Sequence, residues 1–495
     1  KFKGKIREVK MNKELFYKDK NELEKVKLID GIFKTSQAKG KEYLIYLDVD
    51  RLIAPFYEAV GKSPKKKRYG GWEAMGISGH SLGHWLSAVS YMYGATVDSE
   101  LINRLNYVID ELEIIQSYDA KGYLSGFPRK CFDVAFTGEF EVNNFELAGH
   151  WVPWYSIHKV FAGLLDVYRI TANEKALSIL LKLSNWAYEG TKNLTDEQFQ
   201  KMITSEIGGM NDTFAEIFML TGNEKYLELA KRFCQKLILD PLAQNIDELE
   251  GKHSNSQIPK ILGAARLYNI TGEEYYKEAA QFFYNQVVKY RTYVIGGNSK
   301  GEHLGALNDE ELGVTTTETC NTYNMLKLAE ILYNWNPKAE YMDFYERALF
   351  NHILPSQDPD NGTKTYFVST EPGHFKIYCS KEDSFWCCTG TGMENPARYN
   401  KNIYYSKDNE VYINQFISSE YFDKGNNVRI IQKTCLPSSK WTTFEIENGD
   451  KLDLLKIRIP SWSKKNSFIL NGKEIYPKVE NDYAIIENIL SVKDI

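Results

Sequence analysis

An internal repeat in the middle of the chain constrains the fold most strongly. The segments VYRITANEKAL, FMLTGNEKYL and LYNITGEEYY place Thr171, Thr221 and Thr271 at intervals of 50 residues. Each threonine lies between two amphipathic stretches whose apolar residues recur with the helical period. Glycine in TGNE and TGEE predicts a turn, and the acidic residues after it favour the start of a new helix. We therefore expect each repeat to be a helix hairpin.

Looser copies flank these three repeats. LGHWLSAVSYMYGATVDSELINRLNYVIDELE precedes them, CNTYNMLKLAEILYNWNPKAEYMDFYERALFNHIL follows, and LDVDRLIAPFYEAVG could start a sixth hairpin. Such hairpins can stack as an open solenoid or close into an (α/α)6 barrel, a helical toroid. Closure leaves no exposed apolar ends and gathers the loops of one face around a single pocket, so we expect a mainly α chain with an (α/α)6 barrel over residues 41–400.

The pattern changes after about residue 400. Short runs such as EVYINQFI, NVRIIQKTC and LLKIRIPSW alternate apolar and polar residues and are separated by turn signals. This pattern predicts an antiparallel β-sandwich over residues 401–495, incomplete at its C-terminal end. The segment 1–40 is expected to precede the barrel and to contribute strands to the sandwich.

Composition narrows the class of function. The net charge of −5 argues against nucleic acid or an anionic membrane as the main partner, and the sequence has no apolar run long enough to span a bilayer. Aromatic residues make up 14% of the chain, which suits either sugar binding or a tyrosine-rich core. The seven cysteines do not resemble a disulfide framework. They indicate metal-binding or reactive thiols in a reducing compartment, so we expect a cytoplasmic bacterial protein, while secretion or a periplasmic location stays open.

Two segments combine one carboxylate with three thiols. TETC contains Glu318 and Cys320, and FWCCTGTGMEN contains Cys387 and Cys388. Zinc takes four such ligands in a tetrahedron. Adjacent residues point to opposite faces of a strand, so we expect the two neighbouring cysteines in an irregular loop that the following glycines make flexible, and one of the pair to do chemistry. A purely structural zinc, or simply buried cysteines, is the alternative.

Other polar residues suggest a pocket. Glu302 lies in the glycine-rich segment GGNSKGEHLG and is a candidate general acid/base. His158, Asn211 and His253 occupy matching places at the start of successive inner helices, which suggests a shared pocket. His80 and His84 have the i, i+4 spacing that metal ligands can use. Aromatic residues that could form an apolar wall are Trp72, Trp154 and Tyr155.

These motifs resemble those of the glycoside hydrolase family 127 and 146 group, the β-L-arabinofuranosidases. The resemblance runs from DVDRLIAPF through YGGWEAMGISGHSLGHWLSA, PWYSIHKVFAGLLD, GGMNDTFAEIF and HSNSQIPKILGAARLY, and it is most specific in TTETCNTYNMLKLA and SFWCCTGTGMEN. It implies an (α/α)6 barrel followed by β-sandwich domains. It also implies a retaining exo-hydrolase that releases L-arabinofuranose from β-L-arabinofuranosyl oligosaccharides or glycans. A homodimer is one possible assembly.

The resemblance also implies residue roles. Cys387 looks like the nucleophile and Glu302 like the acid/base. The Zn²⁺ ligands would be Glu318, Cys320, Cys387 and Cys388. The residues expected to bind the sugar are His158, His253, Asn211 (where some members carry histidine), Trp72, His80 and Tyr366. In this reading zinc keeps the attacking thiol deprotonated and fixes its direction.

Two alternatives stay open from the sequence. Helical toroids also carry zinc-independent hydrolases and lyases of other plant-polysaccharide sugars, which use two carboxylates. Here Glu73, Glu206 and Asp212 could supply such a pair. The second alternative is a non-catalytic carbohydrate-binding protein with a structural zinc.

Overall fold

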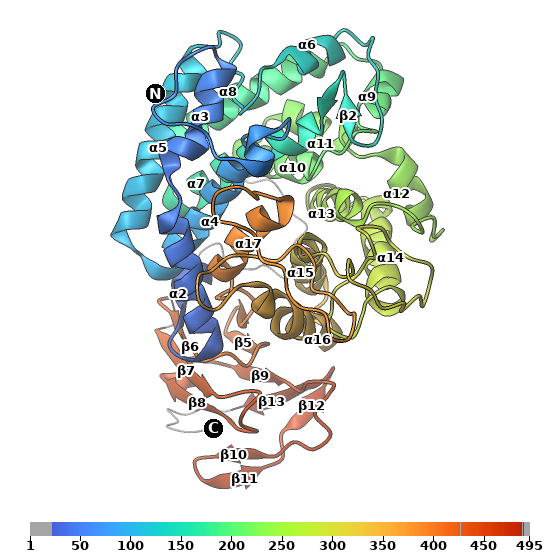
Figure 1. The fold of residues 1–495 in the computed structure, drawn as a ribbon. Helices are drawn as coiled ribbons and strands as arrows, with labels where there is room; N and C mark the ends of the chain where they lie inside the picture. The colour runs from blue at the N-terminus through green and yellow to red at the C-terminus, as the bar shows by residue number, and fades with distance from the viewer. Residues whose placement is uncertain (1–21, 426, 488, 490–495) are drawn as a thin grey trace.

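The computed structural model describes residues 22–425, 427–487 and 489, which form a helical barrel with a β-rich part below it (Figure 1). Two concentric rings of helices make the barrel. The inner ring contains α4 (His80–Thr96), α7 (Pro153–Thr171), α10 (Met210–Thr221), α13 (Ser254–Thr271), α15 (Thr319–Trp335) and α17 (Cys387–Ala397). The outer helices are α2 (Gly31–Tyr46), α3 (Val49–Ala59), α5 (Ser99–Ser117), α8 (Glu174–Thr191), α11 (Glu224–Arg232), α12 (Lys236–Ala243), α14 (Glu274–Tyr290) and α16 (Ala339–Ala348). Shorter helices are α1 (Glu22–Lys25), α6 (Lys130–Ala135) and α9 (Asp196–Met202).

The inner ring is closed. Each inner helix packs against the next in chain order, and the last, α17, packs against the first, α4. The inner helices carry apolar or small side chains on most of their faces, and every residue of α17 is buried. A helix that is buried on all sides must be covered by others, which an outer ring provides. The expected (α/α)6 barrel is therefore confirmed.

The sixth helix pair differs from the expectation. The segment LDVDRLIAPFYEAVG forms α3, which packs on α4 and α5 and does not begin a hairpin of the inner ring. The sixth pair instead joins α2, before the repeats, to α17, after them. These helices are far apart in the sequence, so no local repeat signal could reveal their pairing.

The repeat threonines end the inner helices. Thr171, Thr221 and Thr271 are the last residues of α7, α10 and α13, and each hydroxyl donates to the carbonyl four residues earlier. The next residue in each repeat has left-handed backbone, with φ of 54° at Ala172, 65° at Gly222 and 71° at Gly272. This conformation stops the helix and turns the chain into the next one. The predicted hairpins are confirmed.

The β-rich part contains two main sheets. One has the order β1-β6-β7-β8 and the other β12-β13-β9-β5-β4. The strands are β1 (Val26–Leu28), β4 (Tyr404–Lys407), β5 (Glu410–Ile413), β6 (Ser419–Asp423), β7 (Val428–Thr434), β8 (Thr442–Glu447), β9 (Leu454–Arg458), β12 (Lys478–Glu480) and β13 (Tyr483–Glu487), with a separate hairpin of β10 (Phe468–Leu470) and β11 (Lys473–Ile475).

The β-rich part is not wholly antiparallel. Strands β5 and β9 pair in parallel, because the chain leaves β5, builds β6 to β8 in the other sheet and then returns. The short strand β1 from the N-terminal segment pairs with β6. The remainder of the segment expected to contribute strands, residues 1–21, lies outside the described residues.

A buried arginine joins the β-rich part to the barrel. Arg458 on β9 is 1% exposed and donates to Asp343 and Glu346 of α16 and to the carbonyl of Asn414.

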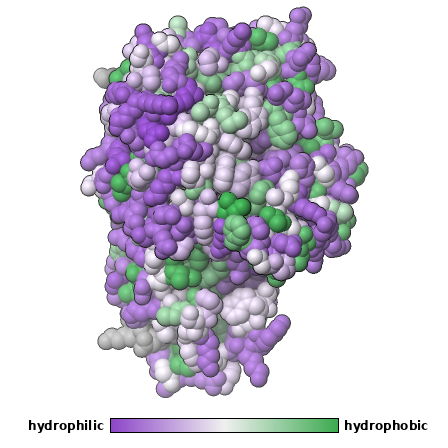
Figure 2. Space-filling model, in the orientation of Figure 1, coloured by the Kyte–Doolittle hydropathy of each residue, from purple (hydrophilic) through white to green (hydrophobic). Residues whose placement is uncertain are grey.

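In the space-filling view the outer helices are largely hydrophilic, while paler and apolar residues gather towards the middle of this face (Figure 2). No helix in the described part of the chain combines the length and apolar character needed to cross a bilayer.

Candidate active site and metal centre

Four potential metal ligands meet at the ends of two neighbouring inner helices. Glu318 is the residue before α15 and Cys320 lies in its first turn, while Cys387 and Cys388 begin α17. One ligand atom from each residue lies within 4.8 Å of the others, and all four residues are buried. The barrel therefore brings together the two motifs that the sequence singled out.

The two adjacent cysteines lie on a helix, so the expectation of an irregular loop is wrong. Neighbouring side chains on a helix are about 100° apart, and both can face one point at the helix end; their sulfurs are 3.9 Å apart. The glycines that follow serve close packing. A Cβ at Gly390 would lie 2.2 Å from the His84 ring, and one at Gly392 would lie 2.6 Å from the Lys364 side chain.

The geometry of the cluster suits a tetrahedral ion. Ligands at Zn–S near 2.3 Å and Zn–O near 2.1 Å would be roughly 3.6–3.8 Å from one another. Glu318 Oε1 lies 3.6 Å from Cys388 Sγ and 3.9 Å from Cys387 Sγ. The other carboxylate oxygen, Glu318 Oε2, is buried without a hydrogen-bond partner. A buried carboxylate with an unsatisfied oxygen beside three thiols is a donor set that could hold a metal ion.

The electrostatics agree with this reading. Burial raises the pKa of Glu318 well above its usual value, and a negative charge on Cys387 raises it further. Burial also raises the pKa of the Cys320 and Cys388 thiols, whereas hydrogen bonds from these two thiols lower the pKa of Cys387 well below its usual value. Of the four groups, only Cys387 has a lowered pKa, whereas the pKa of the other three is raised.

A tyrosine hydroxyl connects this cluster to the glutamate of the glycine-rich loop. The Tyr366 hydroxyl lies 3.5 Å from Cys387 Sγ and donates to the Glu302 carboxylate. On its other side, Glu302 Oε2 is 3.8 Å from His253 Nε2. The contacts thus run in the order Cys387, Tyr366, Glu302, His253.

The pairing with His253 affects both protonation equilibria. It is the largest cause of a lowered pKa at Glu302, and the Tyr366 hydrogen bond acts in the same direction. Burial would lower the pKa of His253, but Glu302 outweighs it and raises the pKa. The pair can therefore hold one proton between them.

The backbone around this site is strained at four residues. Val152, Glu302, Thr317 and Phe385 have φ of 38°, 70°, 52° and 49°. Residues with a side chain rarely adopt this left-handed region, and such strain gathers at functional sites where the surroundings over-determine the conformation. Three of the strained residues are Glu302 itself, Thr317 directly before Glu318, and Phe385 two residues before Cys387, so the left-handed backbone sets the direction of these three side chains.

Several predicted sugar-binding residues lie close by. Trp72 and Tyr366 pack against the apolar cluster that contains Cys320, Cys387 and Cys388, and Tyr155 belongs to that cluster. His80 is fully buried at the start of α4, with its ring 6.5 Å from that of Trp72. His158 on α7 has Nε2 3.1 Å from the Thr213 hydroxyl, next to the Gly208–Gly209 turn.

Two other predicted residues are not brought to the cluster. The Asn211 side chain is fully buried, and its amide donates to the carbonyl of Lys260, which joins α10 to α13. Trp154 is also fully buried and packs against Phe132 and Phe233 of the core between the rings. Their periodic positions reflect helix packing, which sequence periodicity cannot distinguish from a pocket.

The three carboxylates proposed for a metal-free mechanism have different surroundings. Glu73 is 1% exposed and accepts from the backbone of Gly79 and Ser81, so it shapes the turn before α4. Asp212 accepts from Arg266. Glu206 is mostly buried, with its backbone N–H bonded to Asn144. Two of the three are therefore occupied by structural partners.

A buried polar chain behind the cysteines was not expected from the sequence. His84 Nδ1 lies 2.5 Å from Glu394 of α17, and Tyr323 of α15 donates to the same carboxylate. The segment GHSLGH indicated a metal-capable histidine pair, but His84 instead holds α4, α15 and α17 together. Only the glutamate of GMEN, about two helical turns beyond Cys387, hinted at a partner.

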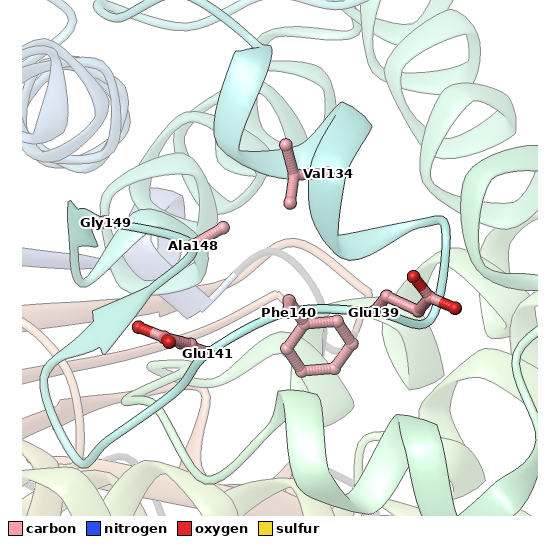
Figure 3. Close-up of a pocket in the computed structure, with 6 residues that line it drawn as sticks. All are labelled: Val134, Glu139, Phe140, Glu141, Ala148 and Gly149. Carbon is pink, nitrogen blue, oxygen red and sulfur yellow. The ribbon is translucent and has the colours of Figure 1, made fainter.

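An open hollow of about 550 Å³ lies between α6, residues 139–141 and the turn of the hairpin β2–β3 (Glu146–Leu147 and His150–Trp151) (Figure 3). Val134 of α6 and Phe140 line it together with Glu139, Glu141, Ala148 and Gly149. The residues that line this hollow include no cysteine, no histidine and not Glu302, so the hollow is separate from the cluster of potential metal ligands.

Comparison with known proteins identifies the family. The family model of the β-L-arabinofuranosidase GH127 catalytic domain matches residues 25–401, and that of the GH127 middle domain matches residues 410–494. A non-reducing end β-L-arabinofuranosidase of Bifidobacterium longum is 23% identical over 453 residues, which cover 81% of this chain and 67% of that protein.

Solved structures agree on the fold. A GH127 β-L-arabinofuranosidase from Geobacillus stearothermophilus T6 matches with a TM-score of 0.72 at 18% identity, over 95% of this chain and 80% of that one. A second GH127 β-arabinofuranosidase matches with a TM-score of 0.73, also at 18% identity, over 95% and 78% of the two chains.

Proposed function

This chain belongs to the GH127 β-L-arabinofuranosidase family of glycoside hydrolases, and from that premise we propose a retaining exo-hydrolase in which Cys387 is the nucleophile and Glu302 the acid/base. The observation that carries the proposal is the Tyr366 hydroxyl, which contacts both the Cys387 sulfur and the Glu302 carboxylate. Two hydrogen bonds separate the two groups, compatible with the roughly 5–5.5 Å at which retaining enzymes hold theirs.

The reaction would have two steps. First, the Cys387 thiolate attacks the anomeric carbon while Glu302 gives its proton to the departing oxygen, so that a thioglycosyl bond replaces the glycosidic bond. Then Glu302 takes a proton from water, and the resulting oxygen nucleophile displaces the sulfur. Two inversions at the same carbon leave the released L-arabinofuranose with the β configuration of the substrate.

The residues of the cluster would hold a zinc ion. Glu318, Cys320 and Cys388 are its other ligands beside Cys387, and when bound the ion supplies a positive charge that keeps the thiols deprotonated. The unsatisfied Glu318 Oε2 and the ligand spacing support this assignment. Glu318→Gln should lower the metal content measured by inductively coupled plasma mass spectrometry, whereas Glu371→Gln, on an exposed loop, should not.

The sugar would lie between the aromatic wall and the histidines. We assign Trp72 to its apolar face and His253 and Tyr366 to its hydroxyls, because these residues contact the cysteine cluster or the acid/base. His158, which contacts Thr213, stays a hydroxyl ligand expected from the sequence. His80 and Asn211 stay predictions from the sequence, since their side chains are completely buried.

Turnover of 4-nitrophenyl β-L-arabinofuranoside tests the proposal. Glu302→Gln should lower kcat by about 10²–10⁴-fold, and Cys387→Ala should abolish turnover while circular dichroism shows an intact fold. Proton NMR should show the β anomer as the first product, and mass spectrometry of quenched enzyme should show one pentosyl group on Cys387. Undiminished activity of Cys387→Ala, or an α anomer formed first, would exclude the mechanism.

A further inference from the structure

The hairpin β2–β3 carries an aromatic side chain whose role the mechanism leaves open. Phe145, immediately before β2, is 36% exposed. Its backbone is firmly held, because its N–H donates to Asn143 Oδ1 at 2.9 Å and its carbonyl accepts from Val152 N–H at 2.8 Å. A large apolar ring in such a fixed, exposed position is available for contact with another molecule.

The hairpin is anchored directly to the active site. Val152 is buried in the same apolar cluster as Cys320, Cys387 and Cys388, and it has the strained left-handed backbone noted above. Trp151 meets Trp72 edge to face, with ring centroids 5.1 Å apart. The carbonyl of Asn144 accepts from the Glu206 N–H at 2.9 Å. The position of Phe145 is therefore fixed relative to the reacting groups.

Phe145 lies on the acid/base side of the site. Its ring meets the His253 ring edge to face, with centroids 5.4 Å apart and planes at 78°. His253 in turn contacts Glu302. The order of contacts is thus nucleophile, Tyr366, Glu302, His253, Phe145. A general acid must contact the oxygen of the leaving group, so groups beyond it on the far side from the nucleophile face the leaving group.

We infer that Phe145 is the binding platform for the leaving group, and that this group is an uncharged sugar ring. The inference rests on the proposed roles of Cys387 and Glu302. A sugar ring presents an apolar C–H face that packs on an aromatic ring, and phenylalanine offers no hydrogen bond that would favour a different group. The exposed carboxylates of Glu146 on β2 and of Glu141, whose carbonyl accepts from the N–H of Ala148 in the hairpin turn, disfavour a uronic acid at this position.

Two substrates separate this role from the rest of the site. Methyl β-L-arabinofuranoside has no leaving sugar, whereas a β-linked L-arabinofuranosyl disaccharide has one. Phe145→Ala should lower kcat/KM for the disaccharide about tenfold, mainly through KM, and change it less than twofold for the methyl glycoside. Phe145→Tyr, which keeps the ring, should retain the disaccharide activity. Tyr476→Ala removes an 86% exposed aromatic from the β-rich part and should affect neither substrate.

The outcomes are distinguishable. Equal losses on both substrates would show that Phe145 only orders His253 and Glu302, and unchanged activity on both would show that it contacts no leaving group; either result overturns the inference. A β-L-arabinofuranosyl peptide is assayed in parallel. A loss in Phe145→Ala on this peptide but not on the disaccharide would assign the platform to a peptide and would also overturn the inference. Turnover of the methyl glycoside by the wild-type enzyme tests the proposed function separately, since that substrate does not reach Phe145.

Discussion

Among single residues, Glu302 has the most informative contacts, because two neighbouring side chains act on its proton equilibrium. Tyr366 donates to Glu302, and His253 forms an ion pair with the same carboxylate. Both contacts stabilise the ionised form of Glu302 and so lower its pKa. The proposed general acid catalysis by Glu302 needs the protonated form, so we expect activity to fall as the pH rises through this pKa.

Replacement of His253 should therefore move the pH profile. In His253→Gln the largest cause of the lowered pKa is removed, the pKa of Glu302 rises, and the alkaline limb of kcat/KM should move to higher pH. A pH series on methyl β-L-arabinofuranoside, whose methanol leaving group must be protonated as it departs, measures this shift. His374→Gln, a histidine of another loop that stacks on Phe375, is the matched control. An unchanged limb, or one at lower pH, would contradict the assignment of Glu302 as the acid.

At the scale of helices, the repeat turns offer an internal comparison. Gly222 and Gly272 occupy the left-handed position after their inner helices, and nothing lies within 4 Å of an added Cβ at either. The first repeat has Ala172 at the same position with φ of 54°. A Cβ has room at these turns, so alanine and glycine should differ in stability there mainly through the cost of the left-handed backbone conformation.

Ala172→Gly should stabilise the protein. The left-handed conformation costs a residue with a Cβ about 1–2 kcal/mol, and the greater freedom of glycine in the unfolded chain returns about 0.4–1 kcal/mol of this. We expect a net gain of about 0.5–1 kcal/mol in the free energy of unfolding, measured by urea denaturation. Gly222→Ala should show a loss of similar size, and two changes of the same sign would refute the argument.

The contact between α17 and α4 should tolerate no side chain at Gly390. An alanine Cβ would lie 2.2 Å from the His84 ring, so one helix must move. Overpacking of this kind costs about 1–3 kcal/mol. Because Cys387 begins the same helix, Gly390→Ala should lower both stability and zinc content. Gly222→Ala is the control for stability alone, and full zinc content in Gly390→Ala would show that α17 had not moved.

At the scale of the whole molecule, Arg458 couples the β-rich part to the barrel. Its guanidinium is completely buried between Asp343 and Glu346. Loss of one partner of a buried ion pair leaves an uncompensated charge, which costs more than the pair contributes. Arginine also fits two carboxylates through its planar fork, which lysine lacks. For the molecule as a whole, the cytoplasmic location and the homodimer stay predictions from the sequence.

Arg458→Met should lower the free energy of unfolding by about 3–5 kcal/mol. Circular dichroism in urea, followed at helix and sheet wavelengths, measures this loss and shows whether the two parts still unfold together. Adding Asp343→Asn and Glu346→Gln removes the stranded charges and should restore part of the stability. If the triple variant were no more stable than Arg458→Met, the ion pairs would not be the cause.

The local units of this protein follow from its amino-acid sequence alone. The 50-residue repeat predicted the helix hairpins around Thr171, Thr221 and Thr271, and the alternating runs after residue 400 predicted strands. The TETC and FWCC motifs provided the donor types of the metal cluster. These features follow from periodicity and side-chain chemistry, which act over a few residues and can be read without knowing how the units pack.

How these units meet depends on long-range contacts in the folded protein. It paired α2 with α17 to close the ring, set β5 parallel to β9, and converted the expected cysteine loop into a helix start. It also buried Asn211 in helix packing and brought the Tyr366 hydroxyl between Cys387 and Glu302. The physical reason is that such contacts join segments tens to hundreds of residues apart, and their energies depend on the shapes of all the intervening elements at once.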